Sequence, residues 1–463
     1  MRIRTRIRTR IPVRTRFPAP SRSHAPSRIR TAATALAAAA GLVILAGCGQ
    51  GDTPDPSGRV TLQFLSLAWQ KESVAANKAL VAQWNRQHPD VQVKYVQGSW
   101  DGIHDQLLTS FEGGQAPDII HDDASDLTDF AYGGYLADIR GMLPASLKKD
   151  IPGRAWSAAT FGKGIYGVPF LQEPRVMVAS TKLLKASGVR VPTVAHPWSW
   201  QEFEQVSKAL TARGPGGTTR RYGVAWSMKE PVSQSVNSSA STGGQIFRKS
   251  GGKNKAVFGP AESAVSQVIN RQINEDHTAP KSSLGMGGSD TLPGFFAGKY
   301  AMVPLNFSFR QQVQQQAPKG FGWTVLPMPA GSGPHGSAQG VVPQTLSVSQ
   351  DSHHKQAAVD FISFLTQGRN AARLALGDWL LPDSRSALKD PALRTQENGW
   401  RTGSGMAGDL VPSPVLGVRG YAEWKDKIAT PAFQEYYNGS IGLSSLRSKL
   451  AGDGQRVLDR YQR

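Results

Sequence analysis

The chain has 463 residues, a single cysteine and a formal charge of +19. Ten arginines but no acidic residue precede Cys48, so the 416 residues from Cys48 onward carry only +9. Because this larger part has no basic run interleaved with aromatic residues, nucleic-acid binding is disfavoured. Its length predicts two lobes rather than one core.

Residues 1–47 have the pattern of a secretory signal: a basic arm, an alanine-rich apolar run and small residues before Cys48. The apolar run is too short to predict a transmembrane helix. Leu45-Ala46-Gly47-Cys48 resembles a bacterial lipobox, which implies cleavage before Cys48 and a lipid on its thiol. The alternative is an ordinary secretory signal that contains a cysteine. Residues 48–58 predict a flexible linker, so the following domain is expected to be extracytoplasmic and anchored to the cell membrane at Cys48.

Strand and helix patterns alternate directly after this linker. Strands are predicted at 60–65, 91–96 and 117–120, where β-branched and other apolar residues dominate. Helices are predicted at 73–88 and 103–111, where apolar residues recur at helical spacing. This order is the start of a doubly wound α/β sheet, in which binding groups lie just past the carboxyl ends of the strands.

Two segments follow predicted strands in this way. Trp69 comes after the first strand, and His121-Asp122-Asp123 follows the third. For Trp69, this position favours ligand binding over a role in the core. Asp122 and Asp123 have two interpretations: ligand-binding carboxylates, or a solvated turn that caps the next helix.

A series of motifs resembles those of family 1 extracellular solute-binding proteins, the carbohydrate-binding components of ABC importers of the maltose-binding-protein type. Each motif is short, but all occur in the family's order across most of the chain. They are Glu112-Gly-Gly-Gln-Ala-Pro-Asp-Ile-Ile120, Gly133-Gly-Tyr-Leu-Ala-Asp-Ile139, Gly162-Lys-Gly-Ile-Tyr-Gly-Val-Pro169, Leu183-Leu-Lys-Ala-Ser-Gly188, Trp198-Ser-Trp-Gln-Glu-Phe203, Phe295-Phe-Ala-Gly-Lys-Tyr-Ala-Met302, Leu326-Pro-Met-Pro329 and Lys355-Gln-Ala-Ala-Val-Asp-Phe-Ile362.

The resemblance implies an α/β, two-lobed periplasmic-binding-protein fold with crossover strands and a C-terminal helical part. Lobe one is expected to comprise 59–168 and 306–349, and lobe two 169–305 and 350–463. The crossovers are expected at 166–170 and 302–306. Leucines and valines at helical spacing from Leu443 to Leu458 predict packed helix in the C-terminal part.

The resemblance also implies positions for ligand-binding residues between the lobes. Glu173, just after the crossover proline, and Glu230, in Lys229-Glu230-Pro231, occupy places where maltose-type proteins have sugar-binding glutamates. Aromatic faces and hydrogen-bonding carboxylates or amides are the groups that a sugar site needs. The complete predicted ligand-binding set is Trp69, Asp122, Asp123, Glu173, Trp226, Glu230, Asn306, Phe307, Gly340 and Trp379.

Other positions depart from the family pattern. A family tryptophan falls near Ser308, where Phe307 or Phe309 would have to substitute, and Val232 replaces a stacking tyrosine. These departures argue against maltose itself and leave carbohydrate as the predicted ligand class. Trp226 and Trp379 are equally compatible with core and cleft positions, Glu173 with a surface pair to Arg175, and Gly340 with a simple turn.

Two other kinds of function remain as alternatives. A glycosidase would use paired carboxylates such as Asp122 and Glu173, but no nucleophile elbow, zinc motif or phosphate-binding loop occurs. An envelope adhesin or scaffold would not need the crossover motifs. The sequence therefore predicts a monomeric receptor, not an enzyme, with no cofactor or metal. Its expected partners are a carbohydrate, the membrane subunits of an ABC permease and, through lipid, the membrane.

Overall fold

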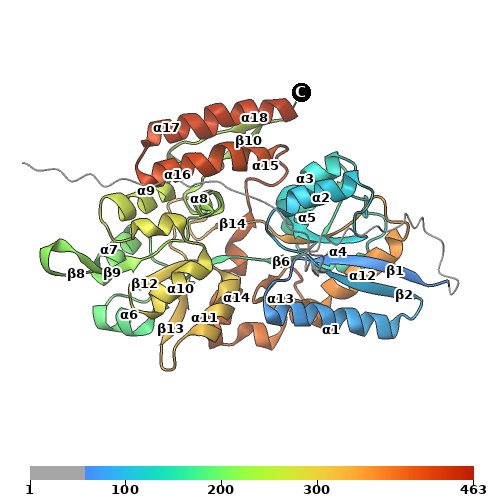
Figure 1. Cartoon of the computed structure of the whole chain (residues 1–463), viewed down its shortest axis with the longest axis horizontal. Helices are drawn as coiled ribbons and strands as arrows, with labels where there is room; N and C mark the ends of the chain where they lie inside the picture. Colours follow the sequence, from blue (N-terminus) through green and yellow to red (C-terminus); the bar gives the residue numbers. More distant parts are fainter. Residues whose placement is uncertain (1–57, 463) are drawn as a thin grey trace, which may run out of the picture. The chain divides into compact units, whose positions relative to one another are not determined.

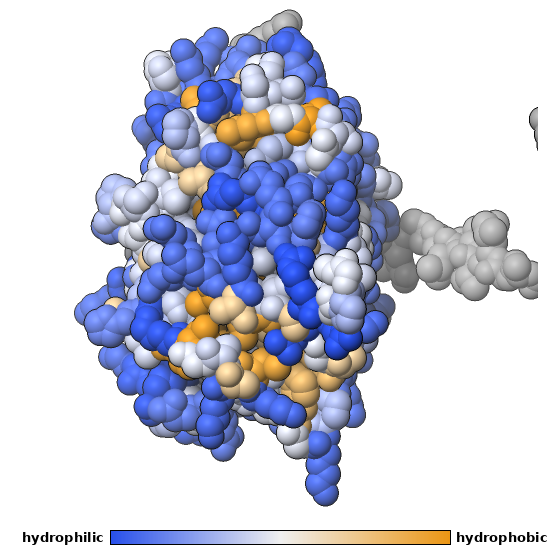
Figure 2. All heavy atoms as spheres, turned by 90° about the vertical axis from the view of Figure 1, so that its left-hand side faces the viewer, coloured by the Kyte–Doolittle hydropathy of each residue, from blue (hydrophilic) through white to orange (hydrophobic). Residues whose placement is uncertain are grey.

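The computed structural model describes residues 58–462. The predicted signal segment, Cys48 and all of the linker before residue 58 lie outside the described residues. Among those described, no helix is long and apolar enough to cross a membrane. The face drawn in Figure 2 is mainly hydrophilic, with apolar residues gathered in limited areas.

A six-stranded mixed sheet contains the predicted N-terminal strands (Figure 1). β1 pairs in parallel with β2 and β3, whereas β15 runs antiparallel to β3 and β6. Its strands, in spatial order, are β16 (Leu381–Pro382), β6 (Val168–Gln172), β15 (Gln344–Val348), β3 (Ile119–Asp123), β1 (Val60–Ser66) and β2 (Val91–Gln97). The helices that belong to this part are α1 (Lys71–Gln87), α2 (Ile103–Glu112), α3 (Ala124–Tyr132), α12 (Lys355–Thr366) and α13 (Gly368–Asp378).

A five-stranded sheet forms the second part of the fold. β7 is antiparallel to both of its neighbours, β13 and β12, and β12 is parallel to β9. The strand order is β13 (Trp323–Leu326), β7 (Arg175–Ser180), β12 (Tyr300–Asn306), β9 (Thr219–Val224) and β8 (Ala212–Arg213). The accompanying helices include α7 (Trp200–Leu210), α8 (Pro231–Ser238), α9 (Pro260–Asn274) and α10 (Gly288–Phe296).

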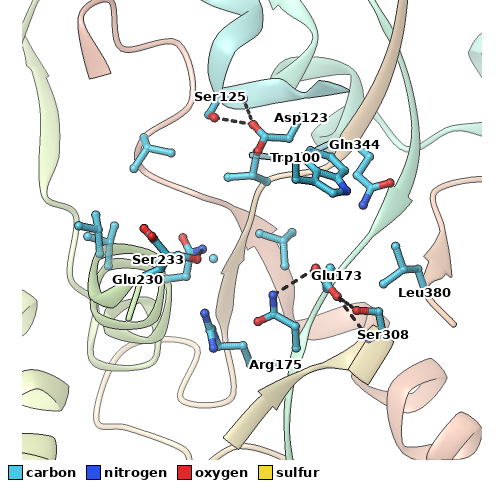
Figure 3. Close-up of a pocket in the computed structure, with 18 of the residues that line it drawn as sticks. Trp100, Asp123, Ser125, Glu173, Arg175, Glu230, Ser233, Ser308, Gln344 and Leu380 are labelled. Carbon is cyan, nitrogen blue, oxygen red and sulfur yellow. Dashed lines mark hydrogen bonds between the residues drawn. The ribbon is translucent and has the colours of Figure 1, made fainter. Parts of the chain in front are cut away.

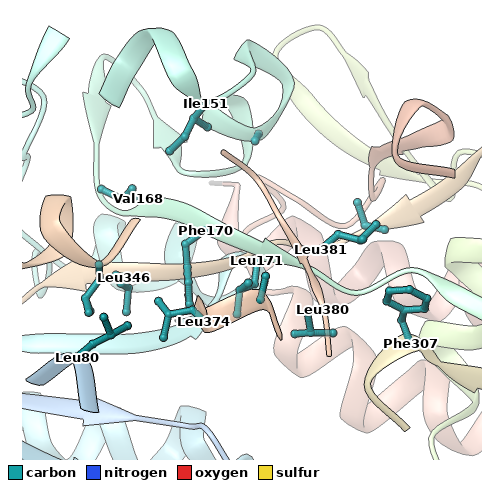
Figure 4. Packing of buried hydrophobic residues seen from close by; sticks show 14 of the residues in the cluster. Leu80, Ile151, Val168, Phe170, Leu171, Phe307, Leu346, Leu374, Leu380 and Leu381 are labelled. Carbon is teal, nitrogen blue, oxygen red and sulfur yellow. The ribbon is translucent and has the colours of Figure 1, made fainter. Parts of the chain in front are cut away.

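Two helix-covered sheets confirm the predicted two-lobed α/β fold. The chain passes from the first sheet to the second through Glu173 and Pro174, which alone separate β6 from β7. A buried apolar cluster continues across this passage, from Leu346 through Leu171 to Leu380 and Phe307 (Figure 4). Polar groups at the passage between the sheets are therefore positioned by a close-packed apolar core.

Sheet membership differs from the expected lobe boundaries in three segments. Residues 169–172, assigned to lobe two, belong to β6 of the first sheet. β13 lies in the second sheet, although 306–349 was assigned to lobe one, because its backbone pairs with β7. Residues 355–382, assigned to lobe two, instead belong to the first sheet, because β16 pairs with β6 and α13 packs against α1. Apolar periodicity in these segments predicts that they are buried, but it does not predict which of the two sheets they pack against.

The C-terminal part is helical, as predicted. It contains α15 (Tyr421–Trp424), α16 (Thr430–Asn438), α17 (Leu443–Arg447) and α18 (Gly454–Tyr461). Leu446, Leu450 and Leu458 are fully buried there. α16 packs against α8 and α9, so this part covers the second-sheet side (Figure 1), and α15 also contacts α3 of the first.

Candidate functional site

A cavity of about 440 Å³ is lined by residues from both sheets. Trp69 and Trp100 follow β1 and β2, Asp123 ends β3, and Asn306 ends β12. In Figure 3, Trp100, Asp123 and Ser125 lie on one side of the cavity and Arg175 and Glu173 on the opposite side. Glu230, just before α8, and Ser233, on α8, flank it. Groups that are distant in the sequence thus converge where strands of both sheets end, as expected for an open α/β sheet.

Aromatic rings form part of this cavity wall. The Trp69 side chain remains 45% exposed, and its ring centroid lies 5.8 Å from that of Phe309. Trp100 contacts the His121 ring edge-on, with 5.5 Å between the centroids. Tyr421 contributes another ring from α15. These rings, of which Trp69 is exposed and Tyr421 largely buried, provide flat apolar surfaces for the C–H faces of a ligand.

His121 is held in one orientation beneath this wall. Its Nδ1 accepts a hydrogen bond from the backbone N–H of Leu67 (3.1 Å), so its protonated Nε2 donates to Gln344 Oε1 (2.9 Å). Burial lowers the pKa of His121 to about 4. The imidazole is therefore neutral at pH 7 and serves to orient Gln344, which itself lines the cavity.

Asp123 caps α3 at the rim of the cavity. Its carboxylate accepts hydrogen bonds from the backbone N–H of Ser125 (2.8 Å) and from the Ser125 hydroxyl. This is the cap that the sequence offered as an alternative to ligand binding. Capping does not exclude a role in ligand binding, because Asp123 both caps the helix and lines the cavity.

Glu173 is fixed by the segment that follows β12. Its carboxylate accepts hydrogen bonds from Asn306 Nδ2 (3.2 Å), the backbone N–H of Ser308 (3.3 Å) and the Ser308 hydroxyl (Figure 3). Burial raises the pKa of Glu173, while the Ser308 bonds oppose that shift. The glutamate therefore enters the cavity already oriented by protein donors.

Arg175 lies two residues further, at the start of β7. Its backbone N–H donates to Gln339 Oε1 (3.0 Å), but its guanidinium has no hydrogen-bond or ion-pair partner within residues 58–462. Burial lowers the Arg175 pKa to about 10, and the charge of Glu173 opposes this. The guanidinium remains cationic and available as a multiple donor to a ligand.

Glu230 lies on the other side of the cavity, just before α8. Pro231 occupies the first helical position, which suits a residue without a backbone N–H. The Glu230 carboxylate is exposed, and no described residue hydrogen-bonds to it. On the next turn, Ser233 Oγ accepts a hydrogen bond from Asn237 Nδ2 (3.3 Å).

Asp378 adds a buried carboxylate from the end of α13. Its Oδ1 accepts a hydrogen bond from the Ser73 hydroxyl, and no other partner of this carboxylate occurs in the described chain. Burial raises the pKa of Asp378 to about 7, against the effect of the Ser73 bond. This residue was not predicted, because its proximity to the cavity depends on packing between α13 and α1.

The structure brings six of the ten predicted ligand-binding residues to the cavity wall. They are Trp69, Asp123, Glu173, Glu230, Asn306 and Gly340. Gly340 faces α8 so closely that a Cβ there would lie 3.0 Å from Asn237 Oδ1. Its missing side chain therefore allows close packing of β14 (Gln339–Val341) against that helix.

The other four predicted residues are not among those that line the cavity. Asp122 lies between His121 and Asp123 on β3, so its side chain points to the opposite face of the strand. Trp226 is fully buried, where its Nε1 donates to Gln272 Oε1 (2.8 Å). Phe307 and Trp379 instead pack against Trp400.

Several cavity residues were missed by the sequence reasoning. Trp100 was detectable, because an aromatic residue directly after the second strand satisfies the same rule as Trp69. Phe309, the other substitute for the family tryptophan, lines the cavity in place of Phe307. Arg175, Ser308 and Lys425 carried no local signal. Within residues 58–462, no cluster of three or more histidine, cysteine or carboxylate side chains could hold a metal ion.

The comparison with known sequences identifies the family. The model of the bacterial extracellular solute-binding protein family matches residues 68–371. A lipoprotein encoded in the oleD 5′ region of Streptomyces antibioticus is 58% identical over 412 residues, which cover 89% of each chain. The chain therefore belongs to the bacterial extracellular solute-binding protein family.

Solved structures share the fold. The GacH receptor of Streptomyces glaucescens, solved unliganded and with acarbose, gives a TM-score of 0.73 at 19% identity and covers 87% of this chain and 99% of its own. A Listeria monocytogenes ABC substrate-binding protein in complex with cycloalternan gives 0.72 at 20% identity, with the same coverage. At these identities the likeness defines the architecture, a two-lobed binding-protein fold.

Proposed function

We propose that this protein is the extracytoplasmic substrate-binding component of an ABC importer and that it captures a sugar or small oligosaccharide. The observation that carries the proposal is the cavity itself, in which Trp69 and Trp100 face hydrogen-bonding groups such as Glu173 and Arg175. Flat aromatic surfaces combined with a few oriented polar groups suit a sugar. The acarbose and cycloalternan bound by its structural neighbours are consistent with this ligand class.

The receptor would work by shifting between open and closed arrangements of two lobes. We assign one lobe to the first sheet with α12 and α13, and the other to the second sheet with the C-terminal helices. Ligand drives closure only to the extent that it binds the closed arrangement more tightly. The closed form would then deliver the sugar to permease subunits, with no covalent step and no cofactor.

The test is a thermal-shift screen of purified residues 58–462 against mono- and oligosaccharides, with amino acids and nucleotides as controls. A ligand that binds only the folded state raises the melting temperature by mass action. A shift with one sugar class, with the sugar recovered unchanged, supports a receptor. Turnover of the sugar would favour the glycosidase alternative, and a shift only with a control compound would contradict the carbohydrate assignment.

We further propose that Cys48 carries the lipid anchor, consistent with the lipobox-like Leu45-Ala46-Gly47-Cys48 and with the relative named as a lipoprotein. Cys48→Ala should move the protein from the membrane fraction to the soluble fraction. Ser57→Ala, in the same linker, is the matched control and should leave it in the membrane. Membrane retention of the Cys48→Ala protein would contradict the assignment.

A further inference from the structure

The charged side chains that line the cavity are unequal in number. Four carboxylates face two cations: Asp123, Glu173, Glu230 and Asp378, against Arg175 and Lys425. His121 adds no charge at pH 7, because burial lowers its pKa to about 4. With all four carboxylates ionised the formal charge of the wall is −2, and it moves toward −1 as Asp378, whose pKa burial raises to about 7, takes up a proton. The whole chain, by contrast, is strongly basic.

The two cations are already associated with carboxylates of the protein. Lys425 Nζ lies 3.5 Å from Asp426 Oδ1. Burial acts to lower the Lys425 pKa, but the charges of the nearby carboxylates outweigh it and raise the pKa; these are Asp426, Asp126, Asp123 and Glu230. Arg175 is stabilised by the charge of Glu173, two residues away. Lys425 is therefore shared among several carboxylates, Glu230 included, and the two cations together cannot neutralise all the carboxylates of the cavity.

Glu230 and Asp378 are the cavity carboxylates with the fewest direct partners. Glu230 has no hydrogen-bond or ion-pair partner in residues 58–462, and Asp378 has only the Ser73 hydroxyl. Asp378 is 7% exposed, so water compensates its charge poorly. A ligand that fills the cavity would remove more water, which raises the cost of leaving both groups without a counter-charge.

Aromatic rings lie in the same wall. Trp69 and Phe309 are tilted by 54° with centroids 5.8 Å apart, and they form an open aromatic corner. Electron-rich faces attract cations, and the attraction grows as water is excluded. The aromatic rings and the carboxylates therefore both favour a cationic ligand. An anionic ligand would add to the excess of negative charge.

We propose that the ligand of this cavity is a positively charged sugar, one that carries a protonated amine, and that Glu230 and Asp378 supply its counter-charge. This inference rests on the proposed sugar-binding function and narrows it. Neutral sugars satisfy the hydrogen-bonding groups but supply no counter-charge for Glu230 or Asp378. Sugars with carboxylate, phosphate or sulfate groups are disfavoured. Glu230 and Asp378 then determine specificity by charge, while the aromatic corner accepts the C–H face.

The experiment measures binding of sugar triplets that differ in one substituent. Glucosamine, N-acetylglucosamine and glucose, together with their β-1,4-linked dimers and trimers, carry an amine, an acetamide or a hydroxyl at the same carbon. Galactosamine and mannosamine provide equivalent sets. Calorimetric titrations at pH 7 keep most of the amines protonated and allow Asp378, whose pKa is about 7, to ionise beside a bound cation. The expected result is at least tenfold tighter binding of the amine member in one triplet, with an affinity that falls as salt is raised.

Charge-neutralising variants separate this proposal from simple shape recognition. Glu230→Gln and Asp378→Asn should each reduce the preference for the amine about fivefold to tenfold and leave binding of the hydroxyl member unchanged. Glu397→Gln removes an exposed carboxylate elsewhere and is the matched control. Glu230 is exposed just before α8, so its variant is expected to fold even if Asp378→Asn does not.

The outcomes distinguish this proposal from the proposed function. Tighter binding of the neutral member, or an amine preference unchanged in Glu230→Gln, overturns the charge inference and leaves sugar binding intact. Binding of spermidine, an amine without a sugar, in the absence of any saccharide binding overturns the proposed function but retains the counter-charge role. If no triplet member and no polyamine binds, both are overturned.

Discussion

The two glutamates that line the cavity differ in the number of hydrogen bonds that the protein donates to them. Glu173 accepts three hydrogen bonds, from Asn306 and Ser308, and lies on the packed passage between the sheets. Glu230, at the start of α8, accepts none from described residues. One side of the site is therefore organised before ligand arrives, and the other leaves a charged group for the ligand to engage. Preorganised groups reduce the ordering cost of binding.

Arg310 explains why the Glu173 side is so well fixed. This fully buried guanidinium donates to the carbonyls of Phe307 (2.7 Å), Asn398 (2.5 Å) and Trp379 (2.8 Å). It also lies 3.2 Å from the centroid of the Phe307 ring. Trp379 and Asn398 have left-handed backbone conformations, with φ of 55° and 52°, which non-glycine residues seldom adopt. Arg310 thus joins the segments that carry Ser308 and Asp378.

The largest predicted effect is the loss of this organisation. Arg310→Met should destabilise the protein by about 3–5 kcal/mol, because three carbonyls lose their donor inside the core. Chemical denaturation of residues 58–462 measures the change.

Arg310→Lys is the matched variant: it keeps the charge but cannot form the same set of bonds, so an intermediate loss is expected. A Met variant as stable as the parent would show that the Glu173 side does not depend on Arg310.

Two buried aspartates near this side allow a second prediction. Burial raises the pKa of Asp383 to about 7, although Gln172 donates to its Oδ1; Asp378 behaves similarly. A folded-state pKa above the unfolded value means that the folded state binds more protons, so these groups make stability fall as pH rises from about 4 to 7. Asp383→Asn should therefore stabilise the protein at pH 8 by about 1–3 kcal/mol.

The check is the free energy of unfolding of both proteins at pH 5 and pH 8. The stabilisation by Asp383→Asn should shrink at the lower pH, where more of the parent Asp383 is protonated. A pH-independent difference would mean that the substitution acts through packing. Asp383 does not line the cavity, so ligand should not alter the effect of Asp383→Asn on stability. Asp378 does line it, so an amine ligand should favour the ionised form of that carboxyl.

The sequence predicted the N-terminal alternation of strands and helices because each of those elements carries its own hydrophobic period. It also placed Trp69, which follows a strand with a recognisable pattern, and the family resemblance placed Glu173 just after the crossover proline. The bonds around Arg310 were beyond such reasoning. They join Phe307, Trp379 and Asn398 across more than 90 positions, and the left-handed backbone at two of them is imposed by tertiary contacts. Neighbouring side chains of a strand point to opposite faces, and the sequence does not say which face of β3 meets the cavity. It therefore could not separate Asp123, which lines the cavity, from Asp122, which does not.

A smaller effect should separate the two sides of the cavity directly. Ser308→Ala removes a hydroxyl donor from Glu173 and should weaken ligand binding by about 1–2 kcal/mol. Ser233→Ala, on α8, removes an exposed hydroxyl whose one hydrogen bond within residues 58–462 is to half-buried Asn237, and it should change affinity little. Calorimetry with the ligand found in the screen measures both. Equal losses would mean that α8 is as well organised as the Glu173 side.

The smallest predicted effect concerns the contact between α3 and the C-terminal part. Both carboxylate oxygens of Asp129 lie within 3.3 Å of the backbone N–H of Gly420, and the Arg419 guanidinium lies 3.1 Å from the centroid of the Tyr132 ring. These contacts join the first-sheet side to the segment that brings Tyr421 and Lys425 to the cavity.

Asp129→Asn keeps an acceptor for Gly420 but removes the charge, so ligand affinity should fall by only about 0.5–1 kcal/mol. Asp105→Asn, on the exposed face of α2, is the control. A larger loss for Asp129→Asn, in dissociation rate as well as affinity, would mean that this contact holds the ligand-bound arrangement together and that the cavity is organised from three sides rather than one.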